Sequence, residues 1–201
     1  MRIALAQFNA SVDDIKGNVN QMQDLSIKAF ELGSDIVVFP EMSICGYPPE
    51  DLLLKKQFID DNRLAVERLA KNCPDITIIT GFTEANEKGY YNSLAVLQEG
   101  CIKKIYHKSV LPNYGVFDER RYFRPGTEAV YMKIGNLTFG FTICEDIWRL
   151  KWMDNLFKKT PPMNIIVNIS ASPFHTGKIE QRQQILSQCA KHCKKHQLYG
   201  S

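Results

Sequence analysis

The chain has 201 residues, which predicts one domain, residues 1–201, with a sizeable core. Its apolar content of 44% and charged content of 23% are those of an ordinary soluble globular protein. The net charge of +3 is small and the Lys and Arg residues are spread along the chain, which argues against a nucleic-acid partner.

The N-terminus carries no basic-then-apolar leader, and no apolar run approaches the roughly 20 residues of a membrane span. These features argue against secretion and against a membrane partner. The six cysteines follow no regular framework spacing, so we expect free thiols in a reducing cytoplasm.

Apolar runs alternate with helical stretches in the first half of the chain. Asp13 or Asp14 is the expected N-cap of the first helix, which Gly33 ends. Glu41 follows the run Asp35–Phe39 in a loop rich in Gly and Pro. The expected strands are Arg2–Phe8, Asp35–Phe39 and Ile76–Phe82, and a helix broken near Gln57 is expected over Leu52–Lys71.

Hairpins are the main feature of the second half. Two pairs of strands flank the turns Glu99-Gly100 and Gly135-Asn136. Lys108 ends the first pair, and the loop Ser109–Gly126 follows it. The expected strands are Tyr91–Gln98, Cys101–His107, Val130–Ile134, Leu137–Ile143 and Asn164–Ile169, and the expected helices are Trp148–Lys158 and Lys178–His196.

Helices that alternate with apolar strands, with hairpins inserted between them, predict an α/β sandwich rather than a simple doubly wound sheet. The last expected helix runs to His196, and no strand is expected after it. An α/β layer normally returns from a helix into the sheet, so we expect a fold that is truncated at its C-terminal end.

Glu41, Lys108 and Cys144 each lie just beyond the C-terminal end of an expected strand, where the ligand crevices of open α/β sheets form. Cys144 is followed by Glu145 and Asp146, whereas buried structural thiols prefer apolar neighbours. A carboxylate can take the proton of a thiol nucleophile, and an ammonium can stabilise the oxyanion of a tetrahedral intermediate. The three residue types together predict a Cys-Glu-Lys site that cleaves amides.

Each of the three residues has a structural alternative when it is taken alone. Glu41 would be a loop carboxylate that caps a helix, Lys108 an exposed lysine after an edge strand, and Cys144 a core thiol. Their coincidence with the surrounding sequence favours catalysis.

The surrounding sequence resembles a known family. The segments are FPEMSICGYPPEDLL around Glu41, HKSVLPNYGVFDERRYF around Lys108 and ICEDIW around Cys144, and they resemble the nitrilase superfamily of carbon–nitrogen hydrolases. Together with NISASPFHTGK, at Asn168–Lys178, they look most like the glutaminase domains of glutamine-dependent NAD synthetases. The resemblance covers essentially the whole chain, in order.

The resemblance implies a catalytic role for three matching positions. Glu41 would be the general base, Lys108 the lysine that stabilises the oxyanion, and Cys144 the nucleophile. Glutamine would be cleaved through a thioester on Cys144, giving glutamate and ammonia.

The resemblance also implies residues that bind the substrate. Tyr114, Ser172 and Lys178 match glutamine-binding positions of the family, and a cation such as Lys178 suits the α-carboxylate of glutamine. Glu119 is implied as a further residue that lines the site. For Ser172 and Lys178, the structural alternative is a helix cap and a solvated first turn.

The implied fold is a four-layer α-β-β-α sandwich that often assembles into homo-oligomers. In such synthetases the ammonia travels to a C-terminal domain that uses ATP to amidate deamido-NAD. No such domain is recognised in this chain, so L-glutamine is the expected substrate and no cofactor is expected. The family's glutaminase domain continues past Ser201.

A stripe of metal-binding side chains on the last expected helix needs a separate interpretation. Cys189, His192, Cys193 and His196 fall on one face of that helix. One helix cannot wrap four ligands tetrahedrally around one ion, so we expect a packing face and no metal site.

Two other hypotheses remain open. A free-standing amidase, nitrilase or carbamoylase of the same superfamily is favoured by the missing synthetase domain and opposed by the segments LPNYGVFDERRYF and SASPFHTGK. An inactive truncated fragment is suggested by the abrupt end after the last expected helix.

Overall fold

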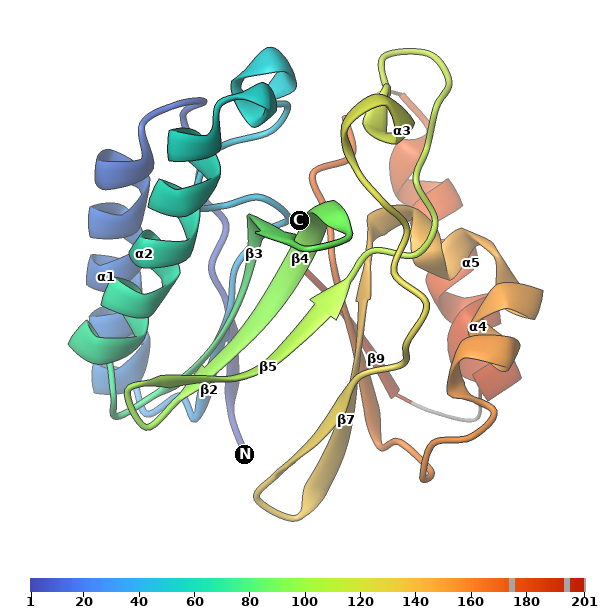
Figure 1. Cartoon of the computed structure of the whole chain (residues 1–201). Helices are drawn as coiled ribbons and strands as arrows, with labels where there is room; N and C mark the ends of the chain where they lie inside the picture. The colour runs from blue at the N-terminus through green and yellow to red at the C-terminus, as the bar shows by residue number, and fades with distance from the viewer. Residues whose placement is uncertain (174–175, 194–195, 201) are drawn as a thin grey trace.

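Two β-sheets face each other between two pairs of helices (Figure 1). The computed structural model describes residues 1–173, 176–193 and 196–200, and side chains up to residue 190. One pair of helices covers the outer face of the first sheet and the other pair covers the outer face of the second sheet. The four helices are α1 (Ile15–Glu31), α2 (Lys56–Asn72), α4 (Leu150–Phe157) and α5 (Lys178–Cys193). The expected four-layer α-β-β-α sandwich is therefore confirmed.

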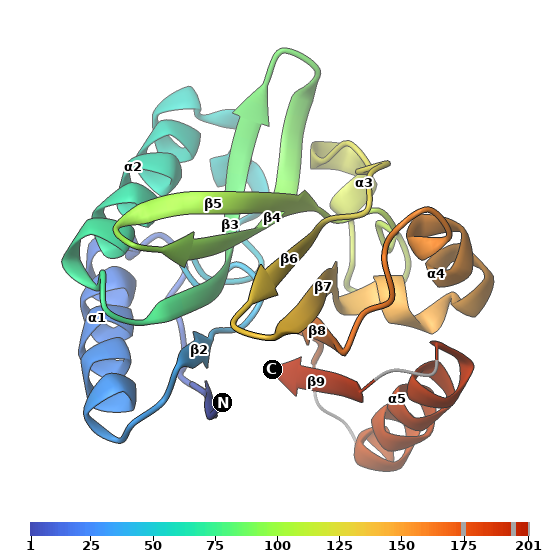
Figure 2. The ribbon, with the colours of Figure 1, turned by 90° about the horizontal axis from the view of Figure 1, so that it is seen from below.

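The first sheet is mixed, and its strands follow one another in chain order (Figure 2). The first three strands are parallel, and the last three form an antiparallel meander. The strands are β1 (Ile3–Leu5), β2 (Ile36–Val38), β3 (Thr77–Asn86), β4 (Gly89–Gln98) and β5 (Cys101–His107). The hairpin between β3 and β4 was missed, because β3 continues four residues beyond the apolar run that ends at Phe82.

The second sheet has the order β6-β7-β8-β9. β6 pairs with β7 in an antiparallel hairpin, and β7, β8 and β9 are parallel. The strands are β6 (Tyr131–Ile134), β7 (Leu137–Ile143), β8 (Ile165–Ile169) and β9 (His196–Gly200).

The expectation of a last helix with no strand after it was wrong. α5 ends at Cys193, and β9 then pairs in parallel with β8. A strand of five residues with few apolar side chains carries too little periodicity to be recognised, and the backbone pairing places it. His196 therefore belongs to β9, so the four metal-binding types do not share one helix. The side chains of His192, Cys193 and His196 lie outside the described residues.

Alternation along the strands divides the core into two parts. Val37 of β2 packs with Val19 and Met22 of α1 on the outer face of the first sheet. Its neighbours Ile36 and Val38 point the other way, into a second cluster that contains the apolar residues of β7 and β8. The contact between the sheets is therefore mainly apolar.

Two shorter pieces complete the frame around these strand ends. The helix expected over Leu52–Lys71 is broken near its start, as predicted, into the 3-10 turn η1 (Glu50–Leu54) and α2. Asp14 is the N-cap of α1, and its carboxylate accepts from the Gly17 N–H at 2.9 Å.

In the part of the chain that the structure describes, no helix combines the length and apolarity that a membrane span requires.

Candidate active site

Glu41 is placed by a close approach between two backbone segments. It lies three residues after β2, and the preceding Pro40 accepts a hydrogen bond from the N–H of Gly81 at 3.2 Å. A Cβ at Gly81 would lie 2.7 Å from the Glu41 Cα and 2.3 Å from the Met42 nitrogen. Only glycine lets β3 approach Glu41 this closely. The side chain of Glu41 is 1% exposed and points into the protein.

Lys108 directly follows β5, and its backbone is fixed on both sides. Its N–H donates to the Asn92 carbonyl at 2.8 Å, and its carbonyl accepts from the Gly126 N–H at 2.8 Å. The side chain is fully buried. Its ammonium donates to Oε1 of Glu41 at 2.8 Å and to Oε1 of Glu119 at 2.7 Å. One cation thus bridges two buried carboxylates.

Three further donors complete the hydrogen bonding of the two carboxylates. Asn92 on β4 donates from Nδ2 to Glu41 at 2.8 Å and to Glu119 at 3.4 Å. The Tyr47 hydroxyl donates to Glu119 at 3.1 Å, and the Ala171 N–H donates to Oε2 of Glu41 at 2.9 Å. Buried charges are stable only when they are paired and hydrogen-bonded in this way.

The electrostatics of this cluster fix its protonation. Burial lowers the pKa of Lys108, but the nearby carboxylates of Glu41 and Glu119 outweigh it and hold that pKa well above the ordinary value. Lys108 is therefore a permanent cation. Burial raises the pKa of Glu119 to about 7, against the opposing effect of Lys108, and the charge of Glu41 adds to the rise. Glu119 is therefore partly protonated at neutral pH.

Cys144 follows the last residue of β7 and begins the 3-10 turn η2 (Cys144–Trp148). Its φ of 44° lies in the left-handed region, which is costly for a residue with a side chain and is common where a functional side chain must be presented. The thiol is 5% exposed, and Sγ accepts a hydrogen bond from the Ser170 hydroxyl at 3.4 Å.

Burial raises the pKa of the Cys144 thiol to about 12, and the negative charge of Glu41 adds to this effect while Lys108 opposes it. The resting side chain is therefore a thiol and not a thiolate, so it would need a base in order to attack a carbonyl.

Asp146 joins the segment that carries Lys108 to the turn that carries Cys144. Oδ1 accepts from the backbone N–H groups of Ser109 at 3.1 Å and Val110 at 2.7 Å. Oδ2 accepts from the Ile143 N–H at 2.9 Å and from the Tyr106 hydroxyl at 2.8 Å. The side chain is completely buried, and burial raises its pKa to about 6 while the backbone donors oppose the rise. Asp146 therefore holds these two segments together, and we call it the clamp.

The three residues implied for glutamine binding lie around the same turn. The Tyr114 hydroxyl donates to Glu145 at 2.9 Å, next to Cys144, and the ring is 56% exposed. The Ser172 N–H donates to the Ser170 hydroxyl at 3.2 Å, which in turn contacts the thiol. The Lys178 ammonium lies over the Trp148 ring, 4.9 Å from its centre. The structure therefore brings all seven predicted site residues to one region.

This geometry can support cleavage of a carbon–nitrogen bond. Glu41 can take the thiol proton as Sγ attacks a carbonyl and can return that proton to the departing nitrogen. The buried Lys108 ammonium can stabilise the oxyanion that would form. The freed Glu41 carboxylate can then activate water against the thioester.

Sequence reasoning missed four residues of this site: Tyr47, Asn92, Asp146 as a clamp, and Ser170. Asn92 carried a usable signal, because it is a polar residue inside the long apolar strand β4, where a buried amide must have partners. The roles of the others depend on loop geometry that no local pattern shows.

Nearly the whole chain is similar to known proteins. Residues 2–192 match the carbon–nitrogen hydrolase family model. A glutamine-dependent NAD(+) synthetase of Thermotoga maritima is 42% identical over 189 residues, which are 93% of this chain and 33% of that protein. The synthetase of Acinetobacter baylyi is 38% identical over 199 residues, which are 98% of this chain and 36% of that protein. The chain belongs to the carbon–nitrogen hydrolase family.

Two solved structures have the same fold over nearly the whole chain. A glutamine-dependent NAD+ synthetase from Acinetobacter baumannii superposes with a TM-score of 0.92 at 33% identity, over 98% of this chain and 38% of that one. An amidase from Nesterenkonia sp. superposes with a TM-score of 0.83 at 20% identity, over 100% of this chain and 75% of that one, and this likeness concerns the fold alone. The chain spans about a third of the length of the curated relatives that it matches.

Proposed function

We propose that the chain is a glutamine-hydrolysing amidase module of the kind found in glutamine-dependent NAD synthetases. Cys144 attacks the side-chain amide of glutamine, ammonia leaves, and water releases glutamate from the thioester. The observation that carries this proposal is the buried ammonium of Lys108 between Glu41 and Glu119, beside a thiol that needs a base. The similarity to named synthetases over nearly the whole chain supports glutamine as the substrate.

The residues around η2 suit the polar ends of glutamine. Lys178 is the cation proposed to bind the α-carboxylate, because its ammonium is already held over an aromatic ring near the thiol. Tyr114 offers a ring and a hydroxyl at the exposed side of the site. Ser172 is proposed to hold the substrate from the side of Ser170.

The ammonia would be used elsewhere. We propose that glutamine hydrolysis needs no cofactor on this chain, and that the ATP and deamido-NAD of the amidation reaction bind to a synthetase domain. Stacking of sandwiches into a homo-oligomer is part of the same proposal. A reducing cytoplasm is the proposed compartment, since Cys45, Cys73, Cys101, Cys144 and Cys189 are free thiols.

Ammonia release separates this proposal from a free-standing amidase. The chain is assayed with glutamine and, in parallel, with propionamide and propionitrile at equal concentration. Turnover of glutamine alone, abolished in Cys144→Ala, supports the proposal. Preference for the aliphatic substrates would assign the chain to the amidases of the same fold, and no turnover of any substrate would contradict a catalytic function for the isolated chain.

A further inference from the structure

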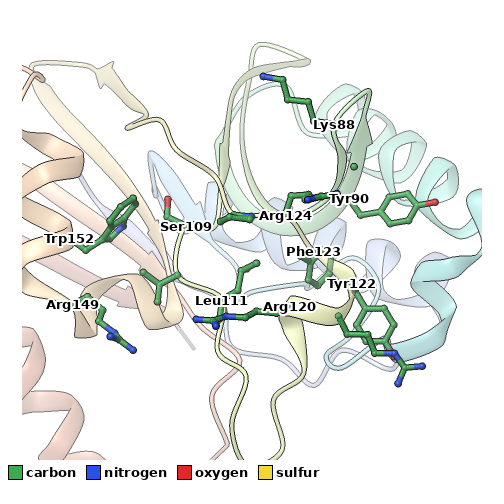
Figure 3. Close-up of a pocket in the computed structure, with 14 residues that line it drawn as sticks. Lys88, Tyr90, Ser109, Leu111, Arg120, Tyr122, Phe123, Arg124, Arg149 and Trp152 are labelled. Carbon is green, nitrogen blue, oxygen red and sulfur yellow. The ribbon is translucent and has the colours of Figure 1, made fainter.

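A large cavity lies outside the candidate active site. It has a volume of about 950 Å³ and lies beside the segment that follows Lys108 (Figure 3). Neither Glu41, Lys108 nor Cys144 lines it. Its size is at the upper end of the roughly 300–1,000 Å³ found for ligand pockets, which is far more than a single phosphate or carboxylate needs. The function proposed above makes no use of this cavity.

The charge of the cavity wall has one sign. No aspartate or glutamate is among the fourteen residues that line it. The described side chains that line it include five cations: Lys88, Arg120, Arg121, Arg124 and Arg149. The whole chain has a net charge of only +3, so this concentration is local and does not reflect a generally basic protein.

Most of these cations have no partner carboxylate. Arg121 lies 3.4 Å from Asp51 and 3.9 Å from Asp118. Within residues 1–173 and 176–190, no carboxylate forms an ion pair with Lys88, Arg120, Arg124 or Arg149. The Arg120 Nε donates to the Leu111 carbonyl, which orients its guanidinium without neutralising it. Like charges around one cavity repel one another, and a bound anion would remove that repulsion.

The wall also carries aromatic rings. Figure 3 shows Arg149 and Trp152 on one side of the cavity, Lys88 and Tyr90 on the other, and Arg124 between them.

We propose that this cavity binds an oligophosphate, the shared chemistry of inorganic polyphosphate and nucleoside polyphosphates. Guanidinium groups match phosphate oxygens in a bidentate geometry, and several of them in one cavity suit a chain of phosphates. The rings of Tyr90 and Trp152 would add a stacking surface if a base is attached. The site is independent of the chemistry at Cys144.

Calorimetric titration of the chain with inorganic tripolyphosphate, ATP and adenosine tests the proposal. We expect saturable binding of tripolyphosphate and ATP that weakens with added salt, and none of adenosine. Tighter binding of ATP than of tripolyphosphate would identify a nucleotide site, and equal binding an inorganic oligophosphate site. Failure of both anions to bind at about 1 mM would overturn the proposal.

Matched variants place the binding. The double variant Arg124→Ala, Arg149→Ala should weaken binding about tenfold or more. The control double variant Lys28→Ala, Lys71→Ala removes the same charge from exposed positions of α1 and α2. It should change the affinity less than about twofold. If the two double variants weakened binding equally, net charge alone would explain the effect, and the proposed site would be contradicted. Unchanged melting temperatures of both double variants serve as the folding control.

Fluorescence gives a second readout at the cavity. The chain has two tryptophans, so Trp148→Phe leaves Trp152 as the only one. Tripolyphosphate should change the emission of Trp152 in this variant with the same midpoint as the calorimetric titration. Calorimetric binding without an emission change would place the anion elsewhere and overturn the assignment.

Discussion

Lys108 and Glu119 are eleven positions apart in the sequence, and their side chains meet in a fully buried ion pair of 2.7 Å that is shared with Glu41. Two carboxyl groups and one ammonium are thus buried away from water. Its stability and its protonation are therefore coupled, and both can be measured.

Replacing Lys108 by methionine should destabilise the protein strongly. The change leaves the two carboxylates buried without their cation, for which a loss of about 3–5 kcal/mol in the free energy of unfolding is typical. Urea denaturation at pH 8 measures it. The control is Lys56→Met, which removes an exposed ion pair with Asp60 and should change the free energy of unfolding far less. Equal effects of the two substitutions would contradict the buried pairing.

Glu119 should make stability depend on pH. Its pKa in the folded protein, about 7, is above the ordinary value of 4.5, so folding favours the protonated form. The associated stability is fully present below about pH 4.5 and is lost as the pH rises through about 7. The difference of pKa corresponds to about 3 kcal/mol.

Glu119→Gln, which cannot ionise, should lack this part of the pH dependence. The free energy of unfolding is measured by urea denaturation between pH 5 and pH 8 for both proteins, and the curves should diverge as the pH rises, the variant losing less stability. Asp146, whose pKa is raised to about 6, is present in both proteins and cancels in the comparison. Parallel curves would show that Glu119 titrates normally.

Asp146→Asn tests the clamp between the two catalytic segments. The amide can no longer accept at every position, because its NH₂ group would face the N–H donors that the carboxylate now binds. We expect a loss of about 2–4 kcal/mol in stability and a kcat reduced at least about tenfold with a small change in KM. Asp24→Asn, on the exposed side of α1, should leave both unchanged. An undiminished kcat in a destabilised variant would limit Asp146 to a structural role.

Gly81→Ala should move Glu41. The new Cβ would lie within 3 Å of the backbone of Glu41 and Met42, so this segment must shift. We expect both a loss of stability and a reduction of kcat for glutamine by about two orders of magnitude, as a displacement of about 1 Å produces. Gly100→Ala is the matched control: its φ of 72° makes alanine unfavourable, but nothing lies near the added atom. It should cost stability without changing kcat.

The positions of Glu41, Lys108 and Cys144 in the fold were predictable because each follows a strand that its sequence defines well. Apolar runs locate β2, β5 and β7, and Glu41, Lys108 and Cys144 lie at or just beyond their carboxyl ends. These strand ends meet because the two sheets pack face to face. The sequence indicated that packing only through its hairpins. The chemical role expected of each residue came from the family resemblance.

Other features could not be predicted because they depend on long-range contacts. Asp146 is two positions after Cys144 in the sequence, but its carboxylate binds the backbone of Ser109 and Val110, 37 and 36 positions away. The short strand β9 is defined by its pairing with β8 and not by its own pattern. The cations that line the cavity come from separate segments of the chain, as Lys88 and Arg149 illustrate. No spacing rule relates these positions in the sequence.

The central claim is that Cys144 forms a thioester with the γ-carbonyl of glutamine. Mass spectrometry of the acid-quenched protein after mixing with glutamine tests it most directly. The unmodified chain is quenched within its first turnover, before the acyl group is released, and Cys144→Ala is the control. The account predicts a mass gain of one γ-glutamyl group on the peptide that contains Cys144, and none in Cys144→Ala. Hydrolysis of glutamine by Cys144→Ala at the rate of the unmodified chain, or an adduct on a different cysteine, would contradict it.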